Sequence, residues 1–479
     1  MTTNAPSARE EQTEALATCR TSHGVEIRSP LRRLNHHAAI FEIYTGDIVL
    51  RVSEVLTEFK ISLREQVIYS GRAVVSNLLQ DGNALVCEVA LDESWCPTEL
   101  AAALPALDAV ETEFANFLRQ YRGAFKVRPA FKLMVADLQM LLMDLKSWLD
   151  QLELALRGNP SGDRDAAEIQ VLSQLQGRVV PWLAGAFERF EEAAEEIEPD
   201  ERPLHASYAK RQLHRLVLSA PFMYRTFQKP LGYAGDYEMV NMMTRDPFEG
   251  SSLFAKMLNT YFLSTAPVVA HRNRIEYLEQ HLLHEAARVA AQGRPMTIFN
   301  LGCGPAKEIQ QFLQKHNVSN NVNFTLLDFN DETLMHVRMV LEEVKRQSGR
   351  RSDLQLIRKS VAQFIKGGAK ASAGAKAYDM VYCAGLFDYL PDHVCATLLE
   401  ILYDSLRPSG LLLATNVAPS NPCQAWMEYA VDWQLIYRDH AQLLALRPSK
   451  ASPDYCQIRS EDTGVNISLE VRKPAHGSG

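Results

Sequence analysis

Apolar and polar residues alternate in short runs between residues 22 and 97. Runs such as AIFEIY (39–44) and ALVCEVAL (84–91) have the two-residue period of strands, and glycines separate several of the runs. Short alternating strands divided by turn residues are typical of a small antiparallel barrel or sandwich. The pattern therefore predicts a small N-terminal β-barrel over residues 22–97, preceded by a disordered tail over residues 1–21.

The apolar period becomes helical after this region. In FKLMVADLQMLLMDLKSWLDQLELAL (131–156) apolar residues recur every three or four positions, which indicates a long amphipathic helix. Long helices of this kind pack against one another as bundles. The pattern predicts a helical region over residues 98–260.

Strand and helix patterns alternate from residue 261 to residue 479. The strand-like runs are TIFNL, FTLLDF, DLQLI, YDMVYC and LLLATNV, and QIRSEDTGVNISLEVR (457–472) predicts a hairpin. Such alternation indicates an α/β fold with a doubly wound, mostly parallel sheet, whose ligands bind at the carboxyl ends of the strands.

Composition excludes several classes of protein. A chain of 479 residues with 47% apolar and 23% charged residues suits a soluble globular protein of two or three domains. The net charge of −8, with dispersed lysine and arginine, disfavours a nucleic-acid partner. No apolar run is long enough to span a membrane, and the first twenty residues lack a secretory pattern. Eight cysteines without a CxxC motif suggest reduced thiols and no metal site, so we expect a cytoplasmic protein.

The run LGCGP carries the first candidate chemistry. Gly302 and Gly304 follow a strand-like run, and the next such run reaches Asp328. A dinucleotide site would have a third glycine where this chain has Lys307. The glycines instead allow the backbone to approach an amino-acid group that has no pyrophosphate. The carboxylate of Asp328 can accept hydrogen bonds from both hydroxyls of a ribose.

In order along the chain, LGCGP, LLDF, YDMVYCAGLFDYLPD and LRPSGLLLATNV resemble the class I methyltransferases that use S-adenosylmethionine. The resemblance implies a Rossmann-like methyltransferase domain over residues 261–479 and S-adenosylmethionine as cofactor. The cofactor-binding residues that it implies are Asn300, Gly302, Cys303, Gly304, Pro305, Asp328, Phe329, Ser360, Val361, Ala384, Gly385 and Leu386. Asn300 departs from the family, where an acid is common, and its amide can reach the methionine ammonium only without a charge.

A second candidate region is the segment FQKPLGYAGDYEMVNMM (227–243). Two tyrosines and an acid between helices suggest a lid over a polar ligand, with Tyr233, Asp236 and Tyr237 pointing inward. The next helix pattern contains AHRNRIEYL (270–278), in which His271 and Arg272 are further catalytic candidates. The group of Arg272, Asn273 and Arg274 suits recognition of an anion, although surface ion pairing would explain it equally well.

The segments PLGYAGDYEMVN, APVVAHRNRIEYL, FNLGCGPAKEI, LLDFN and WMEYAVDWQLIYR together resemble the bacterial methyltransferases associated with 3-hydroxypalmitic acid methyl ester, an extracellular quorum-sensing signal. This resemblance implies a small-molecule acceptor, with the carboxylate of a hydroxy fatty acid as the first candidate. The acceptor-binding residues that we expect are Phe387, Tyr389, Asn416, Trp433, Tyr437 and Arg438.

Two alternatives remain open from the sequence. An oxygen or nitrogen of a phenol, amine or heteroaromatic metabolite would need an acid or base near the methyl group, and His271 and Asp236 are candidates for it. Outside the enzymes, the chain could be a regulator for which S-adenosylmethionine is only a sensed ligand.

The N-terminal segment also resembles a PilZ-like barrel, a kind that can bind cyclic dinucleotides. Its entry SPLRRLN contains Arg32 and Arg33, but His37 and Ile40 stand where that motif has serine and glycine. We therefore expect the barrel to be kept and the nucleotide site to be lost. A structural or dimerising role follows, with a homodimer as one expectation.

Overall fold

The computed structural model describes residues 15–43, 48–63, 66–81, 84–92, 95, 126–157, 164–368 and 377–475. The chain forms two compact units. The first comprises residues Met1–Gly46 and Val55–Lys126, and the second comprises Asp47–Glu54 and Val127–Gly479. A short N-terminal segment therefore belongs to the same unit as the C-terminal half of the chain.

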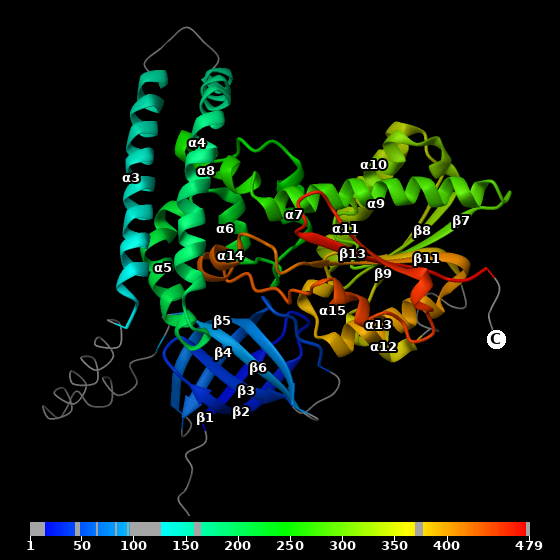
Figure 1. Cartoon of the computed structure of the whole chain (residues 1–479), viewed down its shortest axis with the longest axis horizontal. Coiled ribbons are helices and arrows are strands. Elements are labelled where there is room, and N and C mark those ends of the chain that lie inside the picture. The colour runs from blue at the N-terminus through cyan, green and yellow to red at the C-terminus, as the bar shows by residue number, and fades with distance from the viewer. Residues whose placement is uncertain are drawn as a thin grey trace, which may run out of the picture. The chain divides into compact units, whose positions relative to one another are not determined.

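The first unit is a closed barrel of six antiparallel strands in the order β1-β2-β3-β6-β5-β4 (Figure 1). The strands are β1 (Ala15–Arg20), β2 (Glu26–Leu34), β3 (Ala38–Ile43), β4 (Val55–Leu63), β5 (Gln66–Asp81) and β6 (Ala84–Leu91). Alternate residues such as Ala39 and Phe41 are fully buried, because successive side chains of a strand point to opposite faces. The predicted barrel is confirmed, but its first strand, β1, lies within residues 1–21, where the sequence predicts a disordered tail. The likeness to PilZ stays a prediction.

After the segment 48–54, the second unit continues with helices. They are α3 (Pro129–Arg157), α4 (Arg164–Glu195), α5 (Arg202–Val217), α6 (Pro221–Gln228), α7 (Tyr237–Thr244), α8 (Leu253–Leu263) and α9 (Ala266–Ala290). On α3 the buried side chains Phe131, Val135, Leu138 and Leu142 recur every three or four residues, as the sequence predicted. Part of the predicted helical region, residues 98–125, lies outside the described residues. None of the described helices is long and apolar enough to cross a membrane.

A seven-stranded sheet follows in the order β12-β13-β11-β10-β7-β8-β9. Its strands are β7 (Met296–Leu301), β8 (Val322–Asp328), β9 (Asp353–Arg358), β10 (Tyr378–Cys383), β11 (Leu406–Val417), β12 (Cys456–Ser460) and β13 (Asn466–Arg472). The strands β9, β8, β7, β10 and β11 pair in parallel, and β13 is antiparallel to both of its neighbours. This is the predicted doubly wound, mostly parallel Rossmann-like sheet. Its order reverses between β7 and β10, where ligands of such sheets bind.

Helices cover both faces of the sheet (Figure 1). They include α10 (Lys307–Lys315), α11 (Asp331–Ser348), α12 (Val361–Gly367), α13 (Asp392–Asp404) and α15 (His440–Ala445). The helix α14 (Gln424–Val431) packs instead against α4, α5 and α6. On β7, Ile298 packs in the core beneath α9, α10 and α11, whereas Phe299 packs in the core beneath α12, α13 and α15. A strand buried on both faces is mainly apolar, and MTIFNL has apolar residues at four of its six positions.

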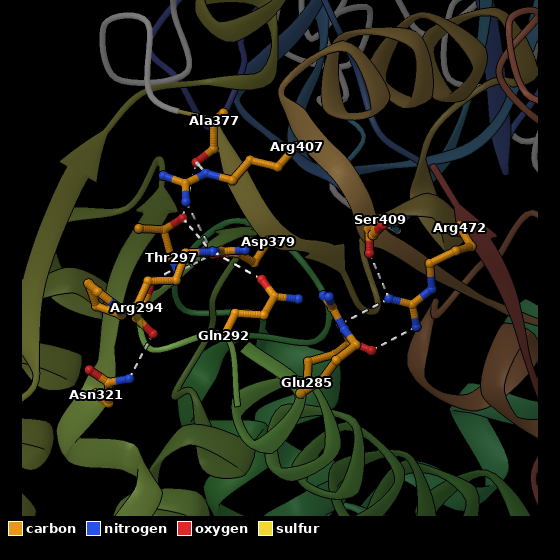
Figure 2. A network of polar contacts seen from close by, with 12 residues as sticks. Glu285, Gln292, Arg294, Thr297, Asn321, Ala377, Asp379, Arg407, Ser409 and Arg472 are labelled. Atoms are coloured by element: carbon orange, nitrogen blue, oxygen red, sulfur yellow. Dashed lines mark hydrogen bonds and ion pairs between the residues drawn. The ribbon is translucent and has the colours of Figure 1, made fainter. Parts of the chain in front are cut away.

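Ion pairs tie the amino ends of the central strands together (Figure 2). Asp379, at the start of β10, accepts two hydrogen bonds from the guanidinium of Arg294, at 2.6 and 2.9 Å, and one from the backbone N–H of Thr297. In the same region, Arg472 donates two hydrogen bonds to Glu285. These charges neutralise one another, so this end of the sheet is a structural clamp and the opposite end remains for a ligand.

Candidate functional site

The glycine loop turns sharply at the carboxyl end of β7. Gly302 and Gly304 have φ angles of 71° and 50°, which side chains other than glycine rarely adopt. The N–H of Gly302 donates to the carbonyl oxygen of Leu327 at 2.8 Å, so the loop is bound to the end of β8. A Cβ atom on Gly304 would meet no other atom within 4 Å. The loop therefore borders open space, as a ligand-binding loop must.

Asp328 ends β8 beside this loop. Its two carboxylate oxygens accept the N–H groups of Gly304 at 3.3 Å and Asn330 at 3.0 Å. Burial raises the pKa of Asp328, and these N–H groups and the nearby Arg51 act in the opposite direction. A carboxylate has about four acceptor positions, so two hydrogen bonds leave capacity for a ribose.

The segment 48–54 contributes a side chain that no sequence motif indicates. The guanidinium of Arg51 lies 4.3 Å from the ring centroid of Phe329 and 4.8 Å from that of Tyr233. The neighbouring Val52 donates its N–H to the carbonyl oxygen of Tyr389 at 3.2 Å. Nothing local to RVSE distinguishes these residues, because their partners lie in distant parts of the chain.

The carboxyl end of β10 holds a second glycine with positive φ. Gly385 has a φ of 81°, and a Cβ atom there would lie 2.9 Å from the guanidinium of Arg274 on α9. The conformation therefore favours glycine, and a side chain there would displace the guanidinium. Arg274 is 7% exposed, and its guanidinium donates to the ring of His271. Burial, with the charges of Arg274 and Arg272, lowers the pKa of His271 well below its usual value, so the imidazole is neutral near pH 7.

Asn300 and Glu308 meet behind the glycine loop. Asn300, at the end of β7, is 2% exposed, and its Nδ2 lies 3.4 Å from Oε1 of Glu308. The hydroxyl of Tyr382 donates to the same oxygen at 2.7 Å. In the part of the chain that the structure describes, Oδ1 of Asn300 has no hydrogen-bond partner. Glu308 was not among the predicted site residues, although it lies within the LGCGPAKEI segment.

The GYAGDY loop differs in part from the predicted lid. A Cβ atom on Gly235 would lie 2.8 Å from the hydroxyl of Tyr389, so the loop packs directly on the predicted acceptor side. Asp236, however, caps α7 by accepting the N–H of Met239 and pairs with Arg225 at 2.9 Å. The hydroxyl of Tyr237 donates to Glu332 on α11 at 2.7 Å. Of the three predicted inward side chains, only that of Tyr233 lies in the cluster beside Phe329.

Several other predicted site residues have structural contacts. Arg272 donates to the carbonyl oxygens of Met243 and Leu263. The guanidinium of Arg438 uses all five N–H groups, on Asp392, Asn416 and two backbone carbonyls. We therefore assign Arg272, Asn416 and Arg438 a structural role and do not include them in the proposed acceptor site.

Most of the remaining predicted residues follow the carboxyl ends of β7, β9 and β10, and Trp433 and Tyr437 follow α14. Ser360 caps α12 by accepting the N–H of Gln363, and Val361 packs on the core. The indole N–H of Trp433 donates to the hydroxyl of Tyr389 at 3.0 Å. The other members of this group are Cys303, Pro305, Ala384, Leu386, Phe387 and Tyr437.

Comparisons with known proteins identify remote structural likenesses. No family model matches the chain, and no curated protein matches it. A possible exported protein from Bordetella parapertussis is 16% identical, with 66% of this chain and 99% of that chain covered and a TM-score of 0.42. Magnesium protoporphyrin IX methyltransferase from Synechocystis is 11% identical, with 43% and 84% covered and a TM-score of 0.31. An O-methyltransferase family protein from Burkholderia thailandensis is 14% identical, with 53% and 71% covered and a TM-score of 0.30. Likenesses this remote do not indicate what this protein does.

Proposed function

We propose that this protein is an S-adenosylmethionine-dependent methyltransferase of a small molecule, with the carboxylate of a hydroxy fatty acid as acceptor. The observation that carries the proposal is the open space beside Gly304, bordered by the carboxylate of Asp328 at the point where the strand order reverses. A structural turn would need neither the open space nor a buried acid at the end of the next strand.

The side chains fit the proposed cofactor at both of its ends. Asp328 would take the ribose hydroxyls, and Phe329 would lie beside the base. The unpaired Oδ1 of Asn300 suits a donor such as an ammonium group. Gly302 and Gly304 keep the backbone between these points free of side chains.

When bound, S-adenosylmethionine supplies an electrophilic sulfonium methyl group. A carboxylate acceptor is already ionised at neutral pH and needs no general base. The protein then has only to position the acceptor and exclude water. The aromatic side chains of Phe387, Tyr389 and Trp433 are buried and suit an apolar chain.

The state of the candidate bases favours a carboxylate over a phenol or amine. Asp236 is engaged by Arg225 and by the N-terminus of α7. His271 is a poor proton acceptor, since burial and two arginines lower its pKa well below the usual value. Neither residue is therefore placed or tuned to remove a proton from an acceptor.

A radiolabelled methyl group on S-adenosylmethionine distinguishes the three hypotheses. The full-length protein is incubated with lipid extract, small-metabolite extract or protein, and the labelled product is identified. We expect label in a lipid fraction, in an ester that is cleaved by base. Label in a small metabolite would favour the phenol or amine alternative, and cofactor binding without transfer to any fraction would favour a sensor.

The matched variants are Asp328→Asn and Asp331→Asn. Asp328→Asn keeps the shape of the side chain but removes the charge, so we expect cofactor affinity to fall by about 1.5–3 kcal/mol. Asp331 lies on the exposed first turn of α11 and pairs with Arg358, so its variant should bind normally. Equal binding by both variants in calorimetry would remove Asp328 from the proposed site.

A further inference from the structure

Glu308 is a buried carboxylate that forms no ion pair with any of the described residues. It is 7% exposed, and its Oε1 atom receives the hydroxyl of Tyr382 and lies near the amide of Asn300. Within the described residues, no lysine, arginine or histidine lies within ion-pair distance of Glu308. A buried charge is normally paired, so this arrangement suggests that a cation arrives with a ligand.

Arg274 is a buried cation that forms no ion pair with a carboxylate of the described residues. Its buried guanidinium packs on Gly385 and hydrogen-bonds only to His271 among the described contacts. No carboxylate of the described residues pairs with it directly. A guanidinium is suited to a carboxylate ligand, which it can bind through two parallel hydrogen bonds.

Glu308 and Arg274 interact electrostatically without forming an ion pair. Arg274 lowers the pKa of Glu308, against the larger effect of burial, which raises it. Both side chains lie at the ends of the two central strands, Glu308 beside Asn300 of β7 and Arg274 against Gly385 after β10. Opposite buried charges that are close but not paired with each other match the two ends of an amino-acid zwitterion.

We propose that Glu308 and Arg274 hold the amino-acid end of the cofactor, with Glu308 and Oδ1 of Asn300 taking the ammonium and Arg274 the carboxylate. This inference rests on the proposed function. It also accounts for the amide at Asn300, because the negative charge absent from the end of β7 is provided by the first turn of α10. Glu308 and Arg274 are thus positioning residues for the methyl donor, and neither acts on the acceptor.

The first experiment compares two ligands by calorimetry on the full-length protein. S-adenosylhomocysteine has the amino-acid end, whereas 5′-methylthioadenosine has the same adenosine without it. We expect Glu308→Gln and Arg274→Met each to weaken S-adenosylhomocysteine at least tenfold and to leave 5′-methylthioadenosine within twofold. The control variants are Glu342→Gln and Arg346→Met, whose side chains are largely exposed on α11.

The outcomes separate this inference from the proposed function. If the wild-type protein binds neither ligand, the proposed function fails. If the wild type binds both and Glu308→Gln keeps full affinity for S-adenosylhomocysteine, only the role proposed for Glu308 and Arg274 fails. Equal losses for the two ligands would also contradict this role, because the substitution would then act on the adenosine end as well.

A third ligand tests which of the two residues, Glu308 or Arg274, binds the ammonium and which binds the carboxylate. The decarboxylated analogue of S-adenosylhomocysteine keeps the ammonium and lacks the carboxylate. Arg274→Met should bind this analogue as well as the wild type does, whereas Glu308→Gln should still bind it at least tenfold more weakly. An Arg274→Met variant that changed only the KM for the acceptor would overturn the assignment of Arg274.

Proton release provides a readout that a merely structural Glu308 would not affect. Burial raises the pKa of Glu308, and the titratable groups that face it are the charged Arg274 on α9 and the neutral Tyr382 on β10 and Cys303 in the loop. An ammonium bound at Glu308 favours the ionised form, so binding should release a proton while Glu308 is partly protonated. Affinity should rise with pH and then level off. Calorimetry in two buffers of different ionisation enthalpy measures the protons, and Glu308→Gln should abolish the release.

Discussion

At the scale of single residues, Gly385 shows that the backbone φ angle and the atoms around a glycine must be considered together. Its φ of 81° alone would favour glycine, and the same is true of Gly349, which has a φ of 65° at the end of α11. Only Gly385 also has a guanidinium where a Cβ atom would stand. The two positions therefore separate backbone strain from displacement of Arg274.

We expect Gly385→Ala and Gly349→Ala to destabilise the protein similarly, each by about 1–2 kcal/mol, because alanine is strained at positive φ. Only Gly385→Ala should also weaken S-adenosylhomocysteine, because its Cβ displaces Arg274. Chemical denaturation measures the first effect and calorimetry the second. Full ligand affinity in Gly385→Ala would show that the position of Arg274 is unimportant for binding.

At the scale of elements, the GYAGDY loop is held by its own acid. The carboxylate of Asp236 combines an N-cap with an ion pair to Arg225, and Gly235 brings the backbone against the hydroxyl of Tyr389. The loop can thus shape the acceptor side through its backbone and Tyr233, while Asp236 fixes where α7 begins.

Asp236→Ala should lower the free energy of unfolding by about 2–4 kcal/mol. The lost N-cap contributes roughly 1 kcal/mol, and a half-buried Arg225 without its partner adds about 1–3 kcal/mol. Tyr237→Phe, which removes an exposed hydrogen bond to Glu332, should cost less than about 1 kcal/mol and leave turnover within about twofold. Thermal denaturation and the methyl-transfer assay test both variants. A fully stable but inactive Asp236→Ala would instead indicate a direct role in the reaction.

The clamp at the amino ends of the strands makes a separate contribution to stability. Burial would raise the pKa of Asp379, but hydrogen bonds from Arg294 and Thr297 outweigh it, and the net effect is a lowered pKa. A carboxylate with a lowered pKa stabilises the fold above its unfolded pKa of about 3.9, and this contribution is lost as pH falls through the folded value.

Asp379→Asn should therefore be less stable than the wild type at neutral pH, and the difference should shrink as the pH falls below about 4. Urea denaturation of both proteins across this range measures it. The matched variant Asp404→Asn removes an exposed partner of Lys450 and should show little difference at any pH. A difference between wild type and Asp379→Asn that stayed constant with pH would contradict the assignment.

At the scale of the whole molecule, the segment 48–54 joins the N-terminal part of the chain to the site. It lies in sequence between barrel strands β3 and β4, yet it belongs to the compact unit that contains the sheet. Ser53 donates its hydroxyl to the carbonyl oxygen of Gln434 at 2.8 Å, and Arg51 lies over Phe329. The proposed cofactor site is therefore built from both ends of the chain.

Arg51→Met should weaken S-adenosylhomocysteine by roughly three- to tenfold, because a cation–π contact of about 0.5–2 kcal/mol that orders Phe329 and Tyr233 is lost. The exposed Arg28→Met on β2 is the control and should bind as the wild type does. Calorimetry on the full-length proteins provides the comparison. Unchanged binding in Arg51→Met would mean that the segment only covers the unit.

The sequence alone determined the elements and the outline of the site. The two-residue and helical periods, the LGCGP turn and the acid at Asp328 are local signals, since each depends on neighbours along the chain. The barrel, the Rossmann-like sheet and the position of the glycine loop could therefore be predicted. The tertiary structure alone decided that Arg51 lies over Phe329, that Arg274 packs on Gly385, and that Asp236 is a cap and not an open acid. These features depend on which distant side chains share a buried space, where an unpaired charge is costly, and a local pattern does not encode that.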